Sequence, residues 1–134
     1  MLNSKKRDRF PAKVYLKKAL VAAVLSSIIN AILFEVGNLI GAFPQEVIIS
    51  GTNQPMAIGQ VIFASAVGSI LGILVYWILG KRTVFLGVAL VILLLSMATP
   101  FTISESPLSM KVFLMIMHLI VGGVTMYVVS TTSK

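Results

Sequence analysis

Cysteine is absent from the 134-residue sequence, and acidic residues are scarce. Without cysteine the chain has no disulfide, no thiolate nucleophile and no cysteine ligand for a metal. The redox compartment is therefore unreadable from cysteine usage. Only four Asp and Glu residues stand against eleven Lys and Arg residues. Most catalytic and metal-binding chemistry that relies on carboxylates or thiols therefore has few residues to work with.

Charge as a whole is also rare, since 11% of the residues are charged and 57% are hydrophobic. This composition is far more apolar than that of an ordinary soluble domain. A net charge of +7 is compatible with nucleic-acid binding when a protein has a polar surface to carry a basic groove. This chain has little such surface. We therefore expect its partner to be a membrane and not a nucleic acid.

Four long stretches of the sequence carry almost no charge. A bilayer core is about 30 Å thick, so a spanning helix needs about 20 mostly apolar residues. Backbone groups inside the bilayer must bond to one another, which favours helices. We therefore predict an all-α fold, a four-helix transmembrane bundle. The expected helices cover about residues 19–40, 56–80, 83–99 and 112–130.

The segments between these stretches are rich in turn formers. Residues 41–55 contain proline, glycine and asparagine, and residues 100–107 form a second polar loop. Lys81 and Arg82 make a very short basic turn, which predicts an antiparallel pair of helices on either side of it. The predicted organisation is a basic tail at 1–18, a transmembrane domain at 19–130 and a short tail at 131–134.

The basic residues lie almost entirely on one side of the predicted bundle. Seven fall within residues 1–18, and Lys81, Arg82 and Lys134 share that side, whereas Lys111 is alone on the other. Segments rich in Lys and Arg stay in the cytoplasm. We therefore expect both termini to be cytoplasmic and the two longer loops to lie outside.

The N-terminal segment has two further interpretations. Its basic start and apolar run are also typical of a secretory signal peptide. The long basic region, the near-spanning apolar run and the lack of an A-x-A site favour a retained helix. Basic residues beside a bilayer attract anionic headgroups, by about 1 kcal/mol each. The residues expected to contact lipid headgroups are Lys13, Lys17 and Lys18.

Two ionisable residues, Glu35 and His118, fall inside the predicted spans, where such groups are candidates for function. At a rise of about 1.5 Å per residue, both lie in the outer part of the membrane. The candidate polar pocket comprises Glu35, His118, Asn30, Asn38, Gln60 and Ser96. Such a pocket is able to hold an ion or small solute. The alternative is that these groups only form interhelical hydrogen bonds, of about 0.6 kcal/mol each. Matched depth predicts that His118 is buried facing Asn30 or Glu35.

Metal, cofactor and catalytic signatures are absent from the sequence. Zinc needs three or four ligands, and only Glu35 and His118 are suitably placed. Met110, Met115 and Met117 resemble soft copper ligands, yet methionine is also ordinary filler in apolar helices. No P-loop, HExxH motif or nucleophile elbow occurs. We expect no metal, no cofactor and no enzymatic activity.

Small residues recur at helical spacing. Ala64, Gly68 and Gly72 lie four residues apart in the second predicted helix, and Gly122 lies one turn after His118. Such ridges allow close helix packing in membranes. Packing within the chain is favoured over a dimer interface, although a second copy or another membrane protein stays open as a partner.

The order of several short motifs resembles an uncharacterised bacterial family of small four-helix membrane proteins, the domain of unknown function 6069. The matching features are Asn30, Gly41, Pro55, the stretch Ser96–Pro100 (SMATP) and the step Met117-His118-Leu119. The resemblance covers roughly residues 18–130, and the basic tail and Glu35 lie outside its pattern. It implies a location in a bacterial membrane and no particular activity, and we expect a multi-pass protein of the cytoplasmic membrane.

These observations favour a non-enzymatic membrane protein with an accessory or envelope role. A small transporter or channel for an ion or solute is the alternative, because it would use the polar pocket of the outer half. A polar path through all depths would favour transport. The predicted inner half is nearly all aliphatic, which favours a pocket or simple packing.

Overall fold

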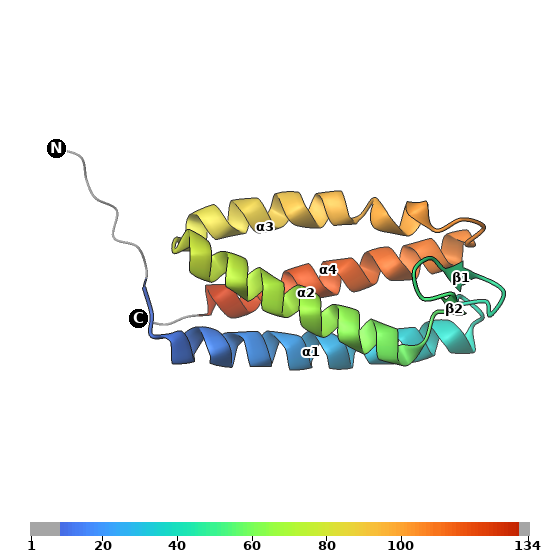
Figure 1. The fold of residues 1–134 in the computed structure, drawn as a ribbon, viewed down its shortest axis with the longest axis horizontal. Helices are drawn as coiled ribbons and strands as arrows, with labels where there is room; N and C mark the ends of the chain where they lie inside the picture. The colour runs from blue at the N-terminus through green and yellow to red at the C-terminus, as the bar shows by residue number, and fades with distance from the viewer. Residues whose placement is uncertain (1–8, 132–134) are drawn as a thin grey trace.

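The structure, a computed structural model, describes residues 9–131, and this part of the chain forms four long helices and one small β-hairpin (Figure 1). The elements are α1 (Ala12–Leu39), β1 (Ile48–Ile49), β2 (Gln54–Pro55), α2 (Ile58–Leu79), α3 (Arg82–Ser96), the 3-10 helix η1 (Thr99–Thr102) and α4 (Leu108–Ser130). Four helical segments, α3 being counted together with η1, are long and apolar enough to cross a membrane. The all-α, four-helix prediction is confirmed.

The helix boundaries differ from the predicted apolar runs because prolines set them. α1 begins at Ala12 rather than near residue 19, directly after Pro11, and α4 begins directly after Pro107. Proline has a fixed φ and no N–H, so it suits the start of a helix, where that donor has no partner. At its other end, α3 stops at Ser96, four residues before Pro100, because proline has no N–H to donate to the carbonyl four residues earlier and its ring clashes with that carbonyl.

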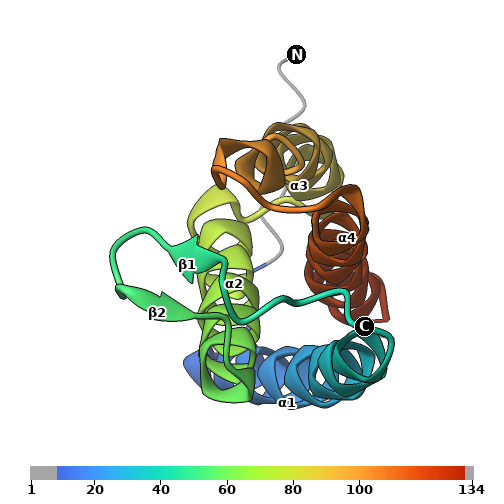
Figure 2. The ribbon, with the colours of Figure 1, turned by 90° about the vertical axis from the view of Figure 1, so that its right-hand side faces the viewer.

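The helices form a four-cornered bundle in which α1 and α3 occupy opposite corners (Figure 2). α1 packs closely against α2 and α4, which also contact each other. α3 contacts α4 somewhat more than α2, does not pack on α1, and buries only Phe85 and Leu93. The bundle is therefore a tight three-helix unit with a loosely attached fourth helix.

Two apolar clusters fill the two ends of the bundle. One lies beside the β-hairpin and includes Phe34, Phe43 and Met110. The other lies beside the short α2–α3 turn and includes Tyr76 and Phe85, whose ring centroids are 5.3 Å apart. We call these two ends the hairpin end and the Lys81 end. A layer of small polar side chains separates the two clusters.

The loop after α1 folds back over the hairpin end. Gly41, at φ +76°, lets the chain turn sharply, and the backbone N–H of Ala42 donates to the Gly37 carbonyl oxygen at 2.8 Å. Phe43 then packs on Gly37, where an added Cβ would lie 2.5 Å from the Phe43 ring. The sequence predicted this loop but not its antiparallel strands, which pair Ile49 with Gln54.

Candidate functional site

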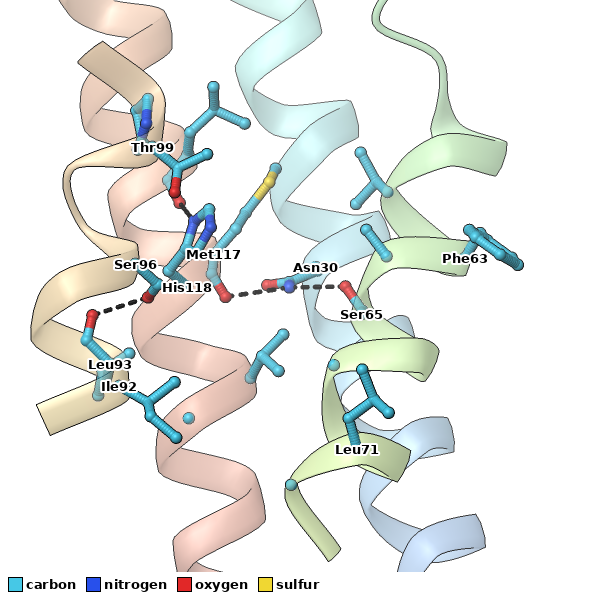
Figure 3. Close-up of a pocket in the computed structure, with 18 of the residues that line it drawn as sticks. Asn30, Phe63, Ser65, Leu71, Ile92, Leu93, Ser96, Thr99, Met117 and His118 are labelled. Carbon is cyan, nitrogen blue, oxygen red and sulfur yellow. Dashed lines mark hydrogen bonds between the residues drawn. The ribbon is translucent and has the colours of Figure 1, made fainter. Parts of the chain in front are cut away.

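A cavity of about 1010 Å³ lies among α2, α3 and α4 (Figure 3). The cavity exists because α3 packs along α4 but contacts α2 less. The contacts between α3 and α2 lie mostly near the turn that joins them. Small residues on the two facing helices, Ala64, Gly68 and Ala89, leave this space unfilled. The hairpin loop, with Ile49 and Met56, covers the end of the cavity.

The lining of the cavity changes character along its length. Polar side chains gather toward the hairpin end, within about 15 Å of it by helical rise. This polar end comprises Asn30, Ser50, Thr52, Gln60, Ser65, Ser96, Thr99, Thr102 and His118. Toward the Lys81 end the lining is apolar except for Thr125, and includes Leu71, Val75, Phe85 and Ala89. None of the described residues that line it is Lys, Arg, Asp or Glu. The cavity is therefore uncharged and amphipathic along its length.

Asn30 connects three helices at the polar end. Its Nδ2 donates to Ser65 Oγ on α2 at 2.9 Å and to the Met117 carbonyl oxygen on α4 at 3.2 Å. The side chain is 1% exposed, and its Oδ1 has no hydrogen-bond partner. Beside it, Ser26 Oγ and Ser69 Oγ lie 2.7 Å apart and join α1 to α2. The polar layer thus fixes how the helices of the tight unit meet.

His118 is partly buried and lines the same cavity from α4. Its Nδ1 donates to the Leu114 carbonyl oxygen one turn earlier, at 2.7 Å. No other described residue forms a hydrogen bond with the ring, so the predicted pairing with Asn30 or Glu35 is wrong. The bond within its own helix satisfies Nδ1 without any partner on α1. In Figure 3 the ring lies between Ser96 and Thr99 on one side and Asn30 and Ser65 on the other.

The family of the chain follows from a match over nearly its whole length. Residues 11–134 match the model of a family of unknown function, DUF6069. The chain belongs to the DUF6069 family. No curated protein and no solved structure matches the chain. The match to the DUF6069 model begins at residue 11, whereas the resemblance based on short motifs began at about residue 18. The match therefore includes the basic first turns of α1.

The predicted pocket residues separate into two groups in this DUF6069 structure. Asn30, Gln60, Ser96 and His118 line the same cavity. Glu35 and Asn38 do not line it and are exposed. For Glu35 the reason is helix rotation, since five residues along a helix correspond to about 140° around its axis from Asn30. Matched depth alone does not give the direction in which each side chain faces.

Some lining residues were outside the prediction altogether. Ser50 and Thr52 come from the turn of the β-hairpin and Thr102 from η1, and nothing in the sequence shows that these segments fold back over the bundle. Ser65 also lines the cavity, and it carried a usable signal, because it lies four residues from Ser69 on the face of α2 that meets α1. No group of three or more His, Asp or Glu side chains able to hold a metal occurs among residues 9–131.

The small-residue ridge of α2 lies against α4. A Cβ added at Gly68 would lie 3.1 Å from Val121, and one added at Gly72 would lie 2.7 Å from Thr125. Ala64 is exposed and lines the cavity. Gly122 lies against α3, where its Cβ would meet the side chain of Leu93 at 2.8 Å. These glycines pack helices within the chain.

The three lysines expected at lipid headgroups do not share one environment. Lys13 and Lys17 are exposed. Lys18 is 8% exposed and its Nζ donates to the Val128 carbonyl oxygen at 2.5 Å, so its assignment to the headgroups is corrected. Val128 is near the end of α4, where carbonyl groups have no partner within the helix and carry partial negative charge. Residues 1–8 and 132–134 lie outside the described residues, so the rest of the predicted tails stays a prediction.

Proposed function

We propose that this DUF6069 protein holds an amphiphilic molecule of the bilayer in the cavity between α2, α3 and α4. On this proposal it is a non-enzymatic accessory or envelope component of the bacterial cytoplasmic membrane. The observation that carries the proposal is the graded lining of the cavity, which is polar at the hairpin end and apolar toward the Lys81 end. Ligand sites of comparable size are typically apolar with a few convergent polar groups.

The rim of the cavity supports entry from the bilayer. Leu71 on α2 and Ile92 on α3 line the cavity, yet they are 53% and 51% exposed. Figure 3 shows them on the two facing helices. In a membrane their exposed surface would meet lipid chains, so a hydrocarbon tail would reach the cavity without crossing water.

The proposed orientation places both chain ends in the cytoplasm and the hairpin end outside. It is supported by the basic residues near the Lys81 end, among them the exposed Lys13, Lys17 and Arg82, against Lys111 alone near the hairpin end. The polar end of the cavity would then lie in the outer leaflet. The exposed lysines of α1 would contact anionic headgroups of the inner leaflet.

Holding a molecule is favoured over conducting an ion. An ion or a polar solute would need polar groups at every depth, because a charge in an apolar medium is costly. Val75, Phe85 and Ala89 close the path toward the Lys81 end with apolar surface. An apolar cavity also excludes ordered water, which needs two to four polar partners.

The test is retention of lipid by the purified chain. Native mass spectrometry after detergent extraction should show one lipid-sized adduct per chain. Ala64→Trp fills the cavity from α2 and should reduce the adduct at least about tenfold, because it removes the volume the tail occupies. Ile70→Trp is the matched control, since Ile70 lies on the same helix, is exposed and does not line the cavity. Equal retention by the two variants would overturn the proposal.

A further inference from the structure

The cavity offers no charged partner to a ligand. Among the described residues that line it, His118 is the only one with an ionisable side chain other than a hydroxyl, and none is Lys, Arg, Asp or Glu. A phosphate or an ammonium group buried there would lose its hydration without a counter-ion, which is strongly unfavourable. The polar end therefore selects against phospholipid headgroups and for an uncharged group.

The unpartnered atoms of the two central polar side chains are both acceptors. Asn30 Nδ2 already donates to Ser65 and Met117, and Oδ1 is left without a partner. His118 Nδ1 must carry the ring proton, because the Leu114 carbonyl oxygen that it contacts can only accept. In the neutral ring Nε2 is then an acceptor, and no described residue donates to it. The adjacent Ser96 hydroxyl is already donating to the Leu93 carbonyl oxygen at 2.7 Å.

The depth of His118 points to a small polar group. His118 is ten residues into α4, about 15 Å from the start of that helix by helical rise. A phospholipid headgroup belongs at the membrane surface, whereas a single hydroxyl on an apolar tail is small enough to reach this level. A ligand that supplies one donor here would also remove the cost of an acceptor left unpaired.

Resting on the proposed lipid-binding function, we propose that the cavity holds an uncharged lipid with a free hydroxyl group. The hydroxyl donates to Nε2 of His118, at the polar end of the cavity that Asn30 also lines. The tail occupies the apolar half between α2 and α3. The ligand class includes diacylglycerols and long-chain isoprenoid alcohols, which share this hydroxyl and differ in their tails.

The experiment titrates the detergent-solubilised full chain with defined lipids and follows binding by native mass spectrometry. The probes are dioleoylglycerol, its acetylated form with the hydroxyl blocked, geranylgeraniol, and dioleoylphosphatidylglycerol. The unblocked alcohols should bind about fivefold more tightly than the acetylated lipid, the size of one net hydrogen bond. His118→Phe should lower affinity for the alcohols to that of the acetylated lipid and leave the acetylated lipid unchanged. The tighter of the two alcohols identifies the tail.

Two controls separate this inference from the proposed function. Ala64→Trp should abolish binding of every probe, whereas His118→Gln keeps an acceptor and should retain the preference for alcohols. Equal affinity for blocked and unblocked dioleoylglycerol, or tighter binding of phosphatidylglycerol, would overturn the inference while leaving the cavity as a lipid site. Binding that Ala64→Trp leaves unchanged would overturn both. Because the blocked and unblocked lipids are compared on the unaltered chain, the result does not depend on any variant folding.

Discussion

One amide side chain joins three of the four helices. Asn30 donates to a hydroxyl on α2 and to a backbone carbonyl on α4, so it fixes the level at which these helices meet α1. Hydrogen bonds between membrane helices contribute about 0.6 kcal/mol each, a small amount for overall stability. Their value lies in specifying register, because a sliding helix would leave these donors unpaired in an apolar surrounding.

The loss of stability caused by a substitution at Asn30 should depend on what it does to the two hydrogen bonds that Nδ2 donates. Asn30→Leu removes both bonds together with the unpartnered Oδ1, and we expect a loss of about 1–2 kcal/mol in the free energy of unfolding. Asn30→Asp keeps the shape but directs a carboxylate at the Met117 carbonyl oxygen, so its loss should exceed that of the leucine variant at pH 7. Unfolding in mixed detergent micelles measures both. Asn38→Asp is the exposed control, and a loss there as large as at Asn30 would contradict this explanation.

Lys18 is a second polar residue that faces the interior of the bundle, and it lies at the Lys81 end. Its ammonium group contacts the carbonyl end of α4, where a cation is favoured by the helix dipole. Lys18→Met keeps a long apolar stem and removes the charge-assisted bond, so unfolding should become easier by about 1.5–3 kcal/mol. Lys17→Met, on the exposed face of the same turn, should change stability by less than about 0.5 kcal/mol. Equal effects in a micelle unfolding assay would show that Lys18 acts only through its charge at the membrane surface.

At the scale of the elements, α2 and α4 pack closely where Gly72 meets Thr125. The Cβ that alanine would add at Gly72 lies 2.7 Å from Thr125 Cγ2, and β-branched threonine has little freedom to move away. Glycine at this position therefore serves close packing. At Gly87 on α3 an added Cβ would meet nothing within 4 Å, so that glycine has no such role.

Gly72→Ala should destabilise the bundle by about 1–3 kcal/mol through overpacking against Thr125. Thr125→Ser removes the clashing methyl group, so the double variant should recover most of that loss. Gly87→Ala should be neutral or stabilising by up to about 1 kcal/mol, because alanine favours helix over glycine. Thermal unfolding in detergent compares the four proteins. Failure of Thr125→Ser to rescue Gly72→Ala would place the clash elsewhere.

The sequence predicts the helices well and their edges poorly. Runs without charge identify the four segments, because the bilayer requires length and apolarity whatever the packing. The starts at Ala12 and Leu108 depend instead on the prolines before them, and polar side chains such as Lys18 are tolerated in the added turns because they find partners. The β-hairpin was missed since two-residue strands leave no periodic signal.

At the scale of the whole molecule, the cavity comes from uneven packing of the four helices. Three helices share the polar layer around Asn30, whereas α3 is fixed mainly at its turn with α2 and along α4. Helix rise places Asn30 and His118 at one depth from sequence alone. Their relation in space was not predictable, because which face of each helix points inward depends on all the partners at once. Glu35 shows the consequence, since it lies five residues from Asn30 on the same helix yet is exposed.

The topology of the whole chain gives the last prediction. Four spans place both ends on the same side, and the excess of basic residues predicts that this side is the cytoplasm. A reporter active only in the cytoplasm should work when fused after residue 134 or at the Lys81-Arg82 turn. A reporter active only outside should work at Thr52, in the hairpin, and at Ser104, in the loop before α4. An outside signal from the C-terminal fusion alone would contradict the four-span arrangement. Outside signals from both the C-terminal fusion and the Lys81-Arg82 turn would mean that the four-span bundle has the opposite orientation. In the inverted case the polar end of the cavity would lie in the inner leaflet, and the lipid it holds would come from there.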